Sequence, residues 1–344
     1  MTDISSLGEF GLIRHLTKDL QSKNPQTIKG VGDDCAILDY GGPRRVLVTS
    51  DMLMEGIHFD LVYTPMKHLG YKAAQVNFSD IYAMNGEPRQ LLVSLAVGKR
   101  FKVEHLEDLY EGIRLACNEF GVDLVGGDTC SSMTGLALSL TCIGDAAPDE
   151  VVGRDGAQEN DLVCVSGNLG AAYMGLQLLE REKKAFESRP ATDAPAADPD
   201  FSGREYLLER FLKPEARRDI VKRLREAGIR PTAMMDISDG LSSEMLHICR
   251  ASKCGCRIYE ERIPLDYQTA VVAEELNMNV TTCALNGGED YELVFTVPLS
   301  QYEQVSKIED VRIVGSITKE SLGCQLITRD GAEFELKAQG FQAF

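Results

Sequence analysis

Six short acidic motifs, spread from residue 32 to residue 290, constrain this chain more than any other feature. Each sets a carboxylate beside glycine, serine or threonine, and most border an apolar run. They are Gly32-Asp33-Asp34, Thr49-Ser50-Asp51, Asn77-Phe78-Ser79-Asp80, Gly126-Gly127-Asp128-Thr129, Asp236-Ile237-Ser238-Asp239-Gly240 and Gly287-Gly288-Glu289-Asp290. Two unit charges about 4 Å apart repel by ~4 kcal/mol at an effective dielectric of about 20. A fold that gathers these segments must therefore place a cation among them. Oxygen ligands without histidine or cysteine suit Mg²⁺.

Length and charge limit the classes of protein to consider. A chain of 344 residues predicts two domains, each large enough for its own core. The net charge of −17 argues against nucleic acid as a partner, because basic surfaces bind phosphate backbones. Nucleotides remain compatible, since Mg²⁺ can reverse the local sign of an acidic site.

The chain shows neither a signal peptide nor an apolar run of membrane-spanning length, so we expect no membrane partner. Cys254-Gly255-Cys256 is the only close pair among ten cysteines. Without a second pair it is a weak zinc signal, and a strand edge is the favoured interpretation. Five others sit singly in apolar surroundings, as buried thiols commonly do: Cys35, Cys117, Cys130, Cys142 and Cys164. A reducing cytoplasm is the expected location.

Hydrophobic periodicity predicts alternating helices and strands in both halves. In the first half we expect helices over 7–20, 68–84 and 103–120, and strands over 46–50, 91–97, 123–125 and 136–143. The chain changes segment near 151–154. Beyond it we expect strands over 162–166, 293–297 and 311–317, and helices over 214–227 and from 241 onward. The stretch 183–205 is polar and rich in Pro, Ala and Asp, which predicts a surface loop or flexible insertion.

Taken singly, most of the motifs have an ordinary explanation. A solvated turn is favoured for Asp33-Asp34, and an N-cap is commoner than a metal site for Thr49-Ser50-Asp51. Asp80 alone is most simply a surface carboxylate, although its neighbours are apolar. The Gly126–Thr129 segment fits a tight turn and a phosphate–Mg²⁺ loop equally well.

The two later motifs are more specific. Asp236 and Asp239 flank Ser238 at the start of a predicted helix, whose N-terminal amides favour anions. Gly287–Glu292 precedes a buried strand and favours a ligand loop over a solvated turn. His58 follows Asp51 closely, and a structural role and a site role are equally compatible with it. No nucleophile-elbow, zinc-protease or Walker-type motif competes with the acidic set.

In their order along the chain, SDMLMEGIHF, NFSDIYAMNGEP, GGDT, DISDGL and GGEDYELVFT resemble the thiamine-monophosphate kinase family. The family belongs to the superfamily of aminoimidazole ribonucleotide synthetase and selenophosphate synthetase. The resemblance covers nearly the whole chain. It implies a two-domain α/β fold of the α+β type. Residues 1–148 would form an ATP- and Mg²⁺-binding domain whose sheet pairs in a homodimer, and residues 149–344 a C-terminal α/β domain closing the cleft.

The resemblance also implies roles for individual residues. Several Mg²⁺ ions would be held by Asp34, Thr49, Ser50, Asp51, Asp80, Asp128, Asp236 and Asp239. We expect the catalytic carboxylates to be Asp51, Asp128 and Asp239. ATP, the co-substrate, would contact Tyr110, Gly127, Asp128, Arg154 and Ser238. Thiamine monophosphate would contact His58, Glu289 and Phe341.

The implied reaction is direct, in-line transfer of the ATP γ-phosphate to thiamine monophosphate, giving thiamine diphosphate, the final step of its biosynthesis. Two alternatives stay open. One is another ATP-dependent enzyme of the superfamily, such as an aminoimidazole ribonucleotide synthetase. The other is a nucleotide-binding regulator without turnover, although such a sensor would not need six carboxylate motifs.

Overall fold

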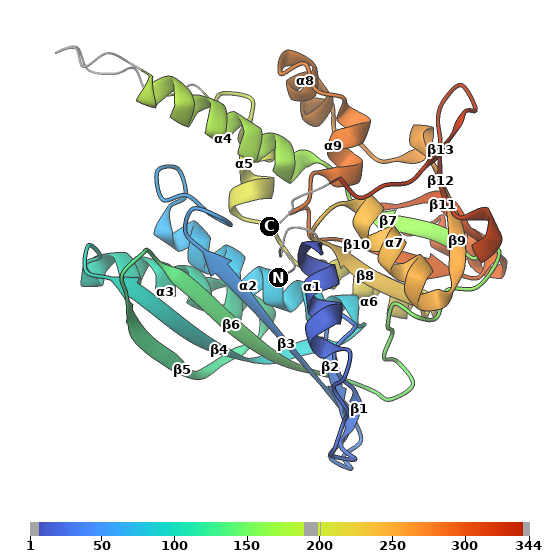
Figure 1. The fold of residues 1–344 in the computed structure, drawn as a ribbon, viewed down its shortest axis with the longest axis horizontal. Coiled ribbons are helices and arrows are strands. Elements are labelled where there is room, and N and C mark those ends of the chain that lie inside the picture. Colours follow the sequence, from blue (N-terminus) through green and yellow to red (C-terminus); the bar gives the residue numbers. More distant parts are fainter. Residues whose placement is uncertain (1–6, 189–198, 200, 340–344) are drawn as a thin grey trace.

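The computed structural model describes residues 7–188, 199 and 201–339. The N-terminal half forms a six-stranded sheet in the order β1-β2-β3-β6-β4-β5 (Figure 1). Its strands are β1 (Thr27–Lys29), β2 (Ala36–Leu38), β3 (Arg45–Met54), β4 (Glu87–Gly98), β5 (Asp123–Ser132) and β6 (Ala137–Ala146). Its helices are α1 (Gly8–Thr17), α2 (Met66–Ala83) and α3 (Val103–Phe120). Helices α2 and α3 lie against one face of the sheet and leave the other face open (Figure 1).

Helix α2 lies at the centre of this half and is buried along most of its length. Its close packing against α3 depends on two glycines. A Cβ atom at Gly70 would lie 1.9 Å from the carbonyl oxygen of Leu109, and one at Gly112 would lie 1.9 Å from that of Lys67. Larger side chains would force the helices apart, so these glycines fix where the polar residues of α2 lie relative to the sheet.

The C-terminal half forms a seven-stranded sheet in the order β13-β12-β9-β11-β7-β10-β8. Its strands are β7 (Leu162–Ser166), β8 (Ala233–Ile237), β9 (Cys254–Tyr259), β10 (Glu292–Val297), β11 (Val311–Lys319), β12 (Cys324–Ile327) and β13 (Glu333–Glu335). Its α-helices are α4 (Ala171–Glu187), α5 (Glu205–Leu212), α6 (Arg218–Glu226), α7 (Leu241–Ser252), α8 (Tyr267–Glu275), α9 (Val280–Asn286) and α10 (Tyr302–Val305). Short 3₁₀ turns follow β9, β10 and β11: η2 (Glu260–Arg262), η3 (Leu299–Gln301) and η4 (Glu320–Leu322).

The largest hydrophobic core contains residues from both halves of the chain. It joins Phe78 and Leu140 of the first half to Ile220 and Phe295 of the second. A separate cluster fills the other face of the second sheet, under α7. The largest core is therefore shared by the two halves, because α2 and α6 both contribute to it between the sheets. This shared core holds the two halves in a fixed relation across the site described below.

The expected helix over 103–120 and the strand over 162–166 are confirmed. Three expectations differ. Gly126–Thr129 forms no turn but continues β5, because parallel pairing to β4 keeps this segment extended. Residues 183–187 are helical, at the end of α4. Residues 214–217 precede α6, and the Ala216 amide donates to Oε1 of Gln75 at 2.9 Å. No helix in the described part of the chain is long and apolar enough to cross a bilayer.

Candidate active site

Three carboxylates that are distant in the sequence meet between the two sheets. Oxygens of Asp34, Asp80 and Asp236 all lie within 4.8 Å of one another. Asp34 lies in the turn between β1 and β2, Asp80 on α2, and Asp236 on β8. We refer to these three residues as the acidic cluster. Both halves of the chain are needed to form it.

Side-chain alternation explains why Asp236 points into the cluster. Along β8, Met235 and Ile237 face the core under α7, whereas Met234 faces the shared core. Asp236 alternates with its neighbours and so faces α2. There the Ser79 hydroxyl donates to Asp236 Oδ2 at 2.6 Å.

Each carboxylate of the acidic cluster is oriented by a neighbouring side chain. Ser79 donates to Asp236, and Thr49 donates to Asp80. Arg154 Nη2 lies 2.6 Å from Asp34 Oδ1, and Arg154 Nε lies 3.3 Å from Oδ1 of the adjacent Asp33. One oxygen of each acid is thereby held. Asp34 Oδ2 is buried and has no hydrogen-bond partner among the described residues.

The electrostatics of the cluster favour an additional cation. Burial, partly opposed by Arg154, raises the pKa of Asp34 to about 8, and burial raises that of Asp236 to about 6. Burial followed by the charge of Asp51 raises the pKa of Asp80 well above its ordinary value. Without a further cation these groups resist ionisation together. Their donors are oxygens only, which is the donor set that Mg²⁺ prefers.

A cavity of about 1110 Å³ opens beside the cluster. Asp51 lines it from β3 and Asp239 from the loop between β8 and α7, with Ser238 beside Asp239. Burial raises the pKa of Asp51 to about 7, with a further contribution from Asp236, and that of Asp239 to about 6. Asp51 Oδ2 is also buried without a hydrogen-bond partner among the described residues. The acidic residues that line the cavity therefore lie close to the acidic cluster.

The cavity is also lined by His58 and by Glu289, whose amide donates to the Ser238 carbonyl at 2.7 Å. The Met54 amide donates to Nδ1 of His58 at 3.0 Å, and burial lowers the pKa of this histidine. Glu289 forms an ion pair with Lys72, a lysine of α2 that is only 2% exposed. Lys72 Nζ also lies 4.1 Å from the centre of the Phe211 ring. Lys72 is not among the residues predicted from the motifs. The available signal was a lysine within a helix that is otherwise buried.

Part of the sixth acidic motif is structural. Asp290 accepts hydrogen bonds from the amides of Gly170 and Ala172, at the start of α4, at 2.7 and 3.3 Å. Glu292 contacts Ser166, Arg210 and Arg217. Of the three acids in this segment, Glu289 alone lines the cavity, together with Gly287 and Gly288. The backbone of Glu289 has φ of 62° and that of Tyr291 φ of 49°, a conformation that L residues seldom adopt.

Two expected metal ligands do not join the acidic cluster within this chain. Strand pairing aligns Met52, Ser139, Ser94 and Asp128 across β3, β6, β4 and β5. Asp128 thus lies three strands from β3, which is about 14 Å, on the face opposite Asp51. Ser50 has the same orientation, since its hydroxyl accepts from Thr141 at 3.1 Å and donates to the Leu140 carbonyl at 3.0 Å.

The remaining expected contacts are dispersed. Gly127 lies on β5 beside Asp128, and Tyr110 packs on α3 against the shared core. Neither lines the cavity. Phe341 lies outside the described residues.

Comparison with known proteins identifies the family of the chain. Residues 32–146 match the model of the family "AIR synthase related protein, N-terminal domain". The chain is 36% identical to thiamine-monophosphate kinase of Aquifex aeolicus, over 87% of this chain and 89% of that protein. It is 32% identical to that of Bacillus subtilis, over 98% of this chain and 100% of the relative. The chain belongs to the thiamine-monophosphate kinase family.

Solved structures extend the family likeness to the whole fold. The structure described as AaThiL complexed with AMPPCP and TMP has a TM-score of 0.83 and 33% identity. The alignment covers 100% of this chain and 99% of the chain in that structure. The expected family and its two-sheet α/β fold are thus confirmed.

Proposed function

We propose that this chain transfers the γ-phosphate of ATP to thiamine monophosphate, forming thiamine diphosphate. The observation that supports this most is the acidic cluster, which unites Asp34, Asp80 and Asp236 from both halves beside a large cavity. Its relatives are named as thiamine-monophosphate kinases, and one solved relative is described as bound to AMPPCP and TMP. Both reactants are anions, so a site for them must supply positive charge.

The residues present fit bound Mg²⁺. Buried oxygens of Asp34 and Asp51 lack hydrogen-bond partners, and Asp80 and Asp236 lie within reach of Asp34. We propose that Asp34, Asp51, Asp80 and Asp236 hold the metal, with Asp239 at the cavity wall. Bound Mg²⁺ would neutralise the phosphate charges and align the two reactants. Ser79, Thr49 and Arg154 keep the carboxylate oxygens oriented, as outer-shell groups do at metal sites.

Different residues around the acidic cluster and the cavity would bind different parts of the substrates. Arg154, already paired with Asp33 and Asp34, supplies positive charge near the cluster for the ATP phosphates. His58 and the Lys72–Glu289 pair would orient thiamine monophosphate in the cavity. The cavity is also lined by carboxylates, including Glu180 and Asp60, which complement the cationic thiazolium ring.

The proposed reaction does not need a general base. A phosphate monoester has a second pKa of about 6, so the acceptor oxygen is largely ionised at neutral pH. The barrier arises instead from bringing two anions together in line. A loose transition state makes positioning and charge neutralisation the main sources of acceleration.

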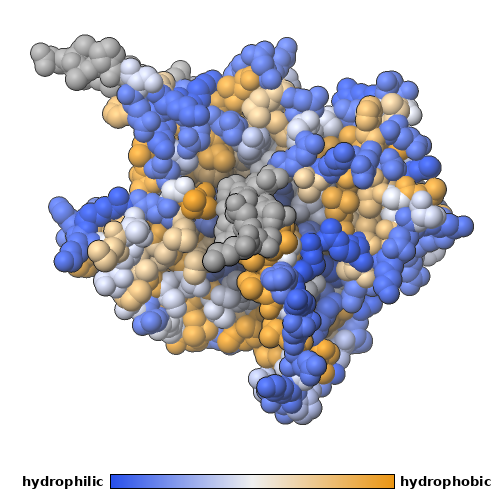
Figure 2. All heavy atoms as spheres, viewed as in Figure 1, coloured by the Kyte–Doolittle hydropathy of each residue, from blue (hydrophilic) through white to orange (hydrophobic). Residues whose placement is uncertain are grey.

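We also propose that the protein forms a homodimer through its N-terminal sheet. Strand β5 is an edge strand whose residues are exposed along nearly its full length. The open face of this sheet also exposes Met52 and Met54, and hydrophobic side chains gather along its lower border (Figure 2). An unprotected edge of this length favours pairing with another chain. Ser50 and Asp128 would then lie at or near the interface.

The proposed location is the cytoplasm, and the proposed domain boundary lies between residues 148 and 149. All ten cysteines are free in the structure, which suits a reducing compartment. The change from the first sheet to the second falls between Ala146 and Leu162.

One assay tests the proposed function. Purified protein is incubated with ATP, Mg²⁺ and thiamine monophosphate, and products are separated by anion-exchange chromatography. We expect equal amounts of ADP and thiamine diphosphate, and neither product when EDTA replaces Mg²⁺. ADP without thiamine diphosphate would contradict the proposed acceptor, and nucleotide binding without ADP would contradict turnover.

A further inference from the structure

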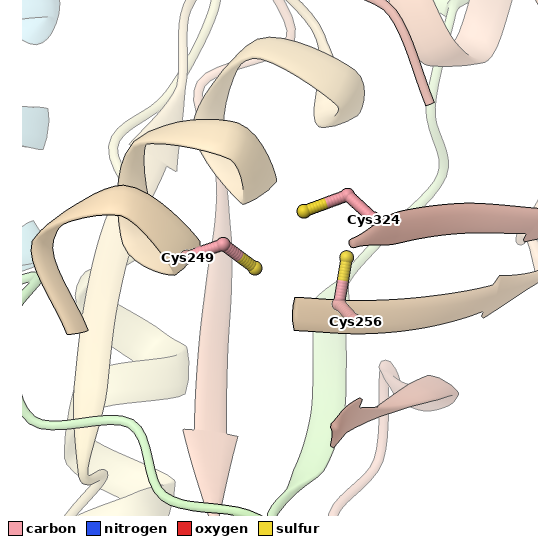
Figure 3. A group of neighbouring side chains, drawn as sticks. All are labelled: Cys249, Cys256 and Cys324. Atoms are coloured by element: carbon pink, nitrogen blue, oxygen red, sulfur yellow. The ribbon is translucent and has the colours of Figure 1, made fainter. Parts of the chain in front are cut away.

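Sulfur atoms from three separate elements converge in the C-terminal half. The Sγ atoms of Cys249, Cys256 and Cys324 all lie within 4.8 Å of one another. They come from α7, β9 and β12, and Figure 3 shows the three side chains directed toward a common point. A fourth, Cys254, contacts the Cys249 thiol and packs against the same core. We call these four residues the thiol cluster.

Strand pairing explains the convergence. Cys256 and Cys324 are directly opposite each other in the parallel ladder between β9 and β12. Cys254 and Cys256 are two residues apart in β9, so their side chains lie on the same face of the sheet. That face packs against α7, and Cys249 lies in the last turn of this helix.

Glycines let the backbones around the thiols approach closely. A Cβ atom at Gly255 would lie 2.3 Å from the carbonyl oxygen of Gly323. That same carbonyl accepts a hydrogen bond from the Cys256 amide at 3.2 Å. Lys253 connects α7 to β9 in a left-handed conformation, with φ of 53°. Glycine at 255 is thus required by the close contact, and glycine at 323 is favoured by its positive φ of 65°.

We propose that the thiol cluster is a structural zinc site, with Cys249, Cys256 and Cys324 as ligands and Cys254 as the fourth. Zn–S bonds of about 2.3 Å in a tetrahedron place sulfurs about 3.8 Å apart, so a small closure of Cys249, Cys256 and Cys324 would suffice, and Cys254 would move further to complete the set. Soft thiolates select Zn²⁺ over the Mg²⁺ expected at the carboxylates. On binding, each ligating thiol loses its proton to solvent.

The surrounding charges are compatible with thiolates at this position. Arg250, next to Cys249 in α7, is a cation that acts on Cys324. Arg250 would also partly balance the negative charge of a zinc ion bound by four thiolates. The site is half-buried at Cys254 and Cys324, which leaves a path for the metal to enter.

The position of the cluster gives the metal a mechanical role. It would join the C-terminal end of α7 to β9 and β12. The N-terminal end of α7 follows directly on Asp239 at the cavity wall. A zinc ion would therefore stabilise the helix that positions this loop, while lying at the opposite end of the helix from the reacting groups.

Metal analysis of the intact, full-length chain tests the proposal without using activity. Protein is produced with zinc in the medium, purified under reducing conditions without chelator, and measured by native mass spectrometry. We expect one zinc ion per chain in the wild type, and its loss in Cys256→Ala and Cys324→Ala. The matched control is Cys164→Ala: Cys164 is equally buried in the same sheet, and burial alone raises its thiol pKa, with no contribution from another cysteine.

Cobalt substitution identifies the ligands independently of whether the variants fold. Co²⁺ bound by the wild type should give the near-ultraviolet charge-transfer absorption of thiolate ligation, and Asp236→Asn should retain it. A wild-type chain that takes up no zinc and shows no such absorption would overturn the proposal. A protein mass that stays lower by two or four hydrogens under reductant would also overturn it, because the thiols would then form disulfides.

Discussion

Two buried acidic groups in this protein contrast sharply. In the acidic cluster, Asp34 contacts the cation Arg154, whereas Asp80 and Asp236 accept hydrogen bonds from the hydroxyls of Thr49 and Ser79. In the second group, Asp290 and Glu292 meet Arg210 and Arg217. Asp290 also accepts amide hydrogen bonds at the start of α4. The second group is compensated by the protein itself, whereas the first leaves Asp34 Oδ2, like Oδ2 of nearby Asp51, without a hydrogen-bond partner among the described residues.

The comparison shows how to separate a ligand site from a structural ion network when both consist of buried acids. Buried charge without a partner is costly, so a fold retains it where something else supplies the missing charge. Within four residues the sixth motif supplies a cavity residue, Glu289, which pairs with Lys72, and two acids held by arginines, Asp290 and Glu292. Replacing members of each group should therefore affect different properties.

The largest expected effect is on activity. Asp236→Asn keeps an acceptor for Ser79 but removes a metal-binding charge, so kcat should fall by about 10³-fold, or ~4 kcal/mol. Removing one of several repelling charges should leave the metal-free protein at least as stable as the wild type. Steady-state kinetics with saturating Mg²⁺ and thermal unfolding in EDTA measure the two properties. A variant that turns over normally would place the metal elsewhere.

Arg210→Met should instead affect stability. It leaves Glu292 and Asp290 buried with one fewer cation, and the free energy of unfolding should fall by about 3 kcal/mol in urea titrations. Lys222→Met is the control, because its pair with Glu226 is exposed and should contribute almost nothing. Equal losses in the two variants would mean that the buried network is not distinctive.

The pH dependence of stability should report on the acidic cluster. The pKa values of Asp34 and Asp51 are raised to about 8 and about 7 in the folded chain. Between pH ~4 and pH ~8 the folded state then binds more protons than the unfolded state, so stability falls as pH rises. In EDTA we expect a loss on the order of 2 kcal/mol across this range. Saturating Mg²⁺ should reduce it, because the metal binds the ionised form; identical slopes would argue against binding here.

The smallest expected effect concerns Glu289. Glu289→Gln keeps the size of the side chain but weakens the ion pair with Lys72, so the KM for thiamine monophosphate should rise about fivefold, or ~1 kcal/mol. The value of kcat and the KM for ATP should change little. A loss of kcat instead would assign Glu289 to the metal site and blur the distinction between the two acidic groups.

Local pattern predicted the principal elements well, because apolar periodicity depends only on neighbours in the chain. The helix over 103–120 and the strand over 162–166 are examples. It failed where distant partners override local preference. Glycines 126 and 127 suggested a turn, yet pairing with β4 keeps them in β5. Cys254-Gly255-Cys256 does begin strand β9, as expected, but its approach to Cys249 and Cys324 depends on the packing of α7 and β12.

The sequence by itself determined the residue types, the order of the acidic motifs and the family they resemble. Only the tertiary structure decided which carboxylates meet. Asp51 and Asp128 occur in similar motifs, but strand alternation turns them to opposite faces of one sheet, about 14 Å apart. Glu289 and Asp290 are adjacent, yet one faces the cavity and the other the start of α4. Convergence of charges depends on long-range packing, which no single motif encodes.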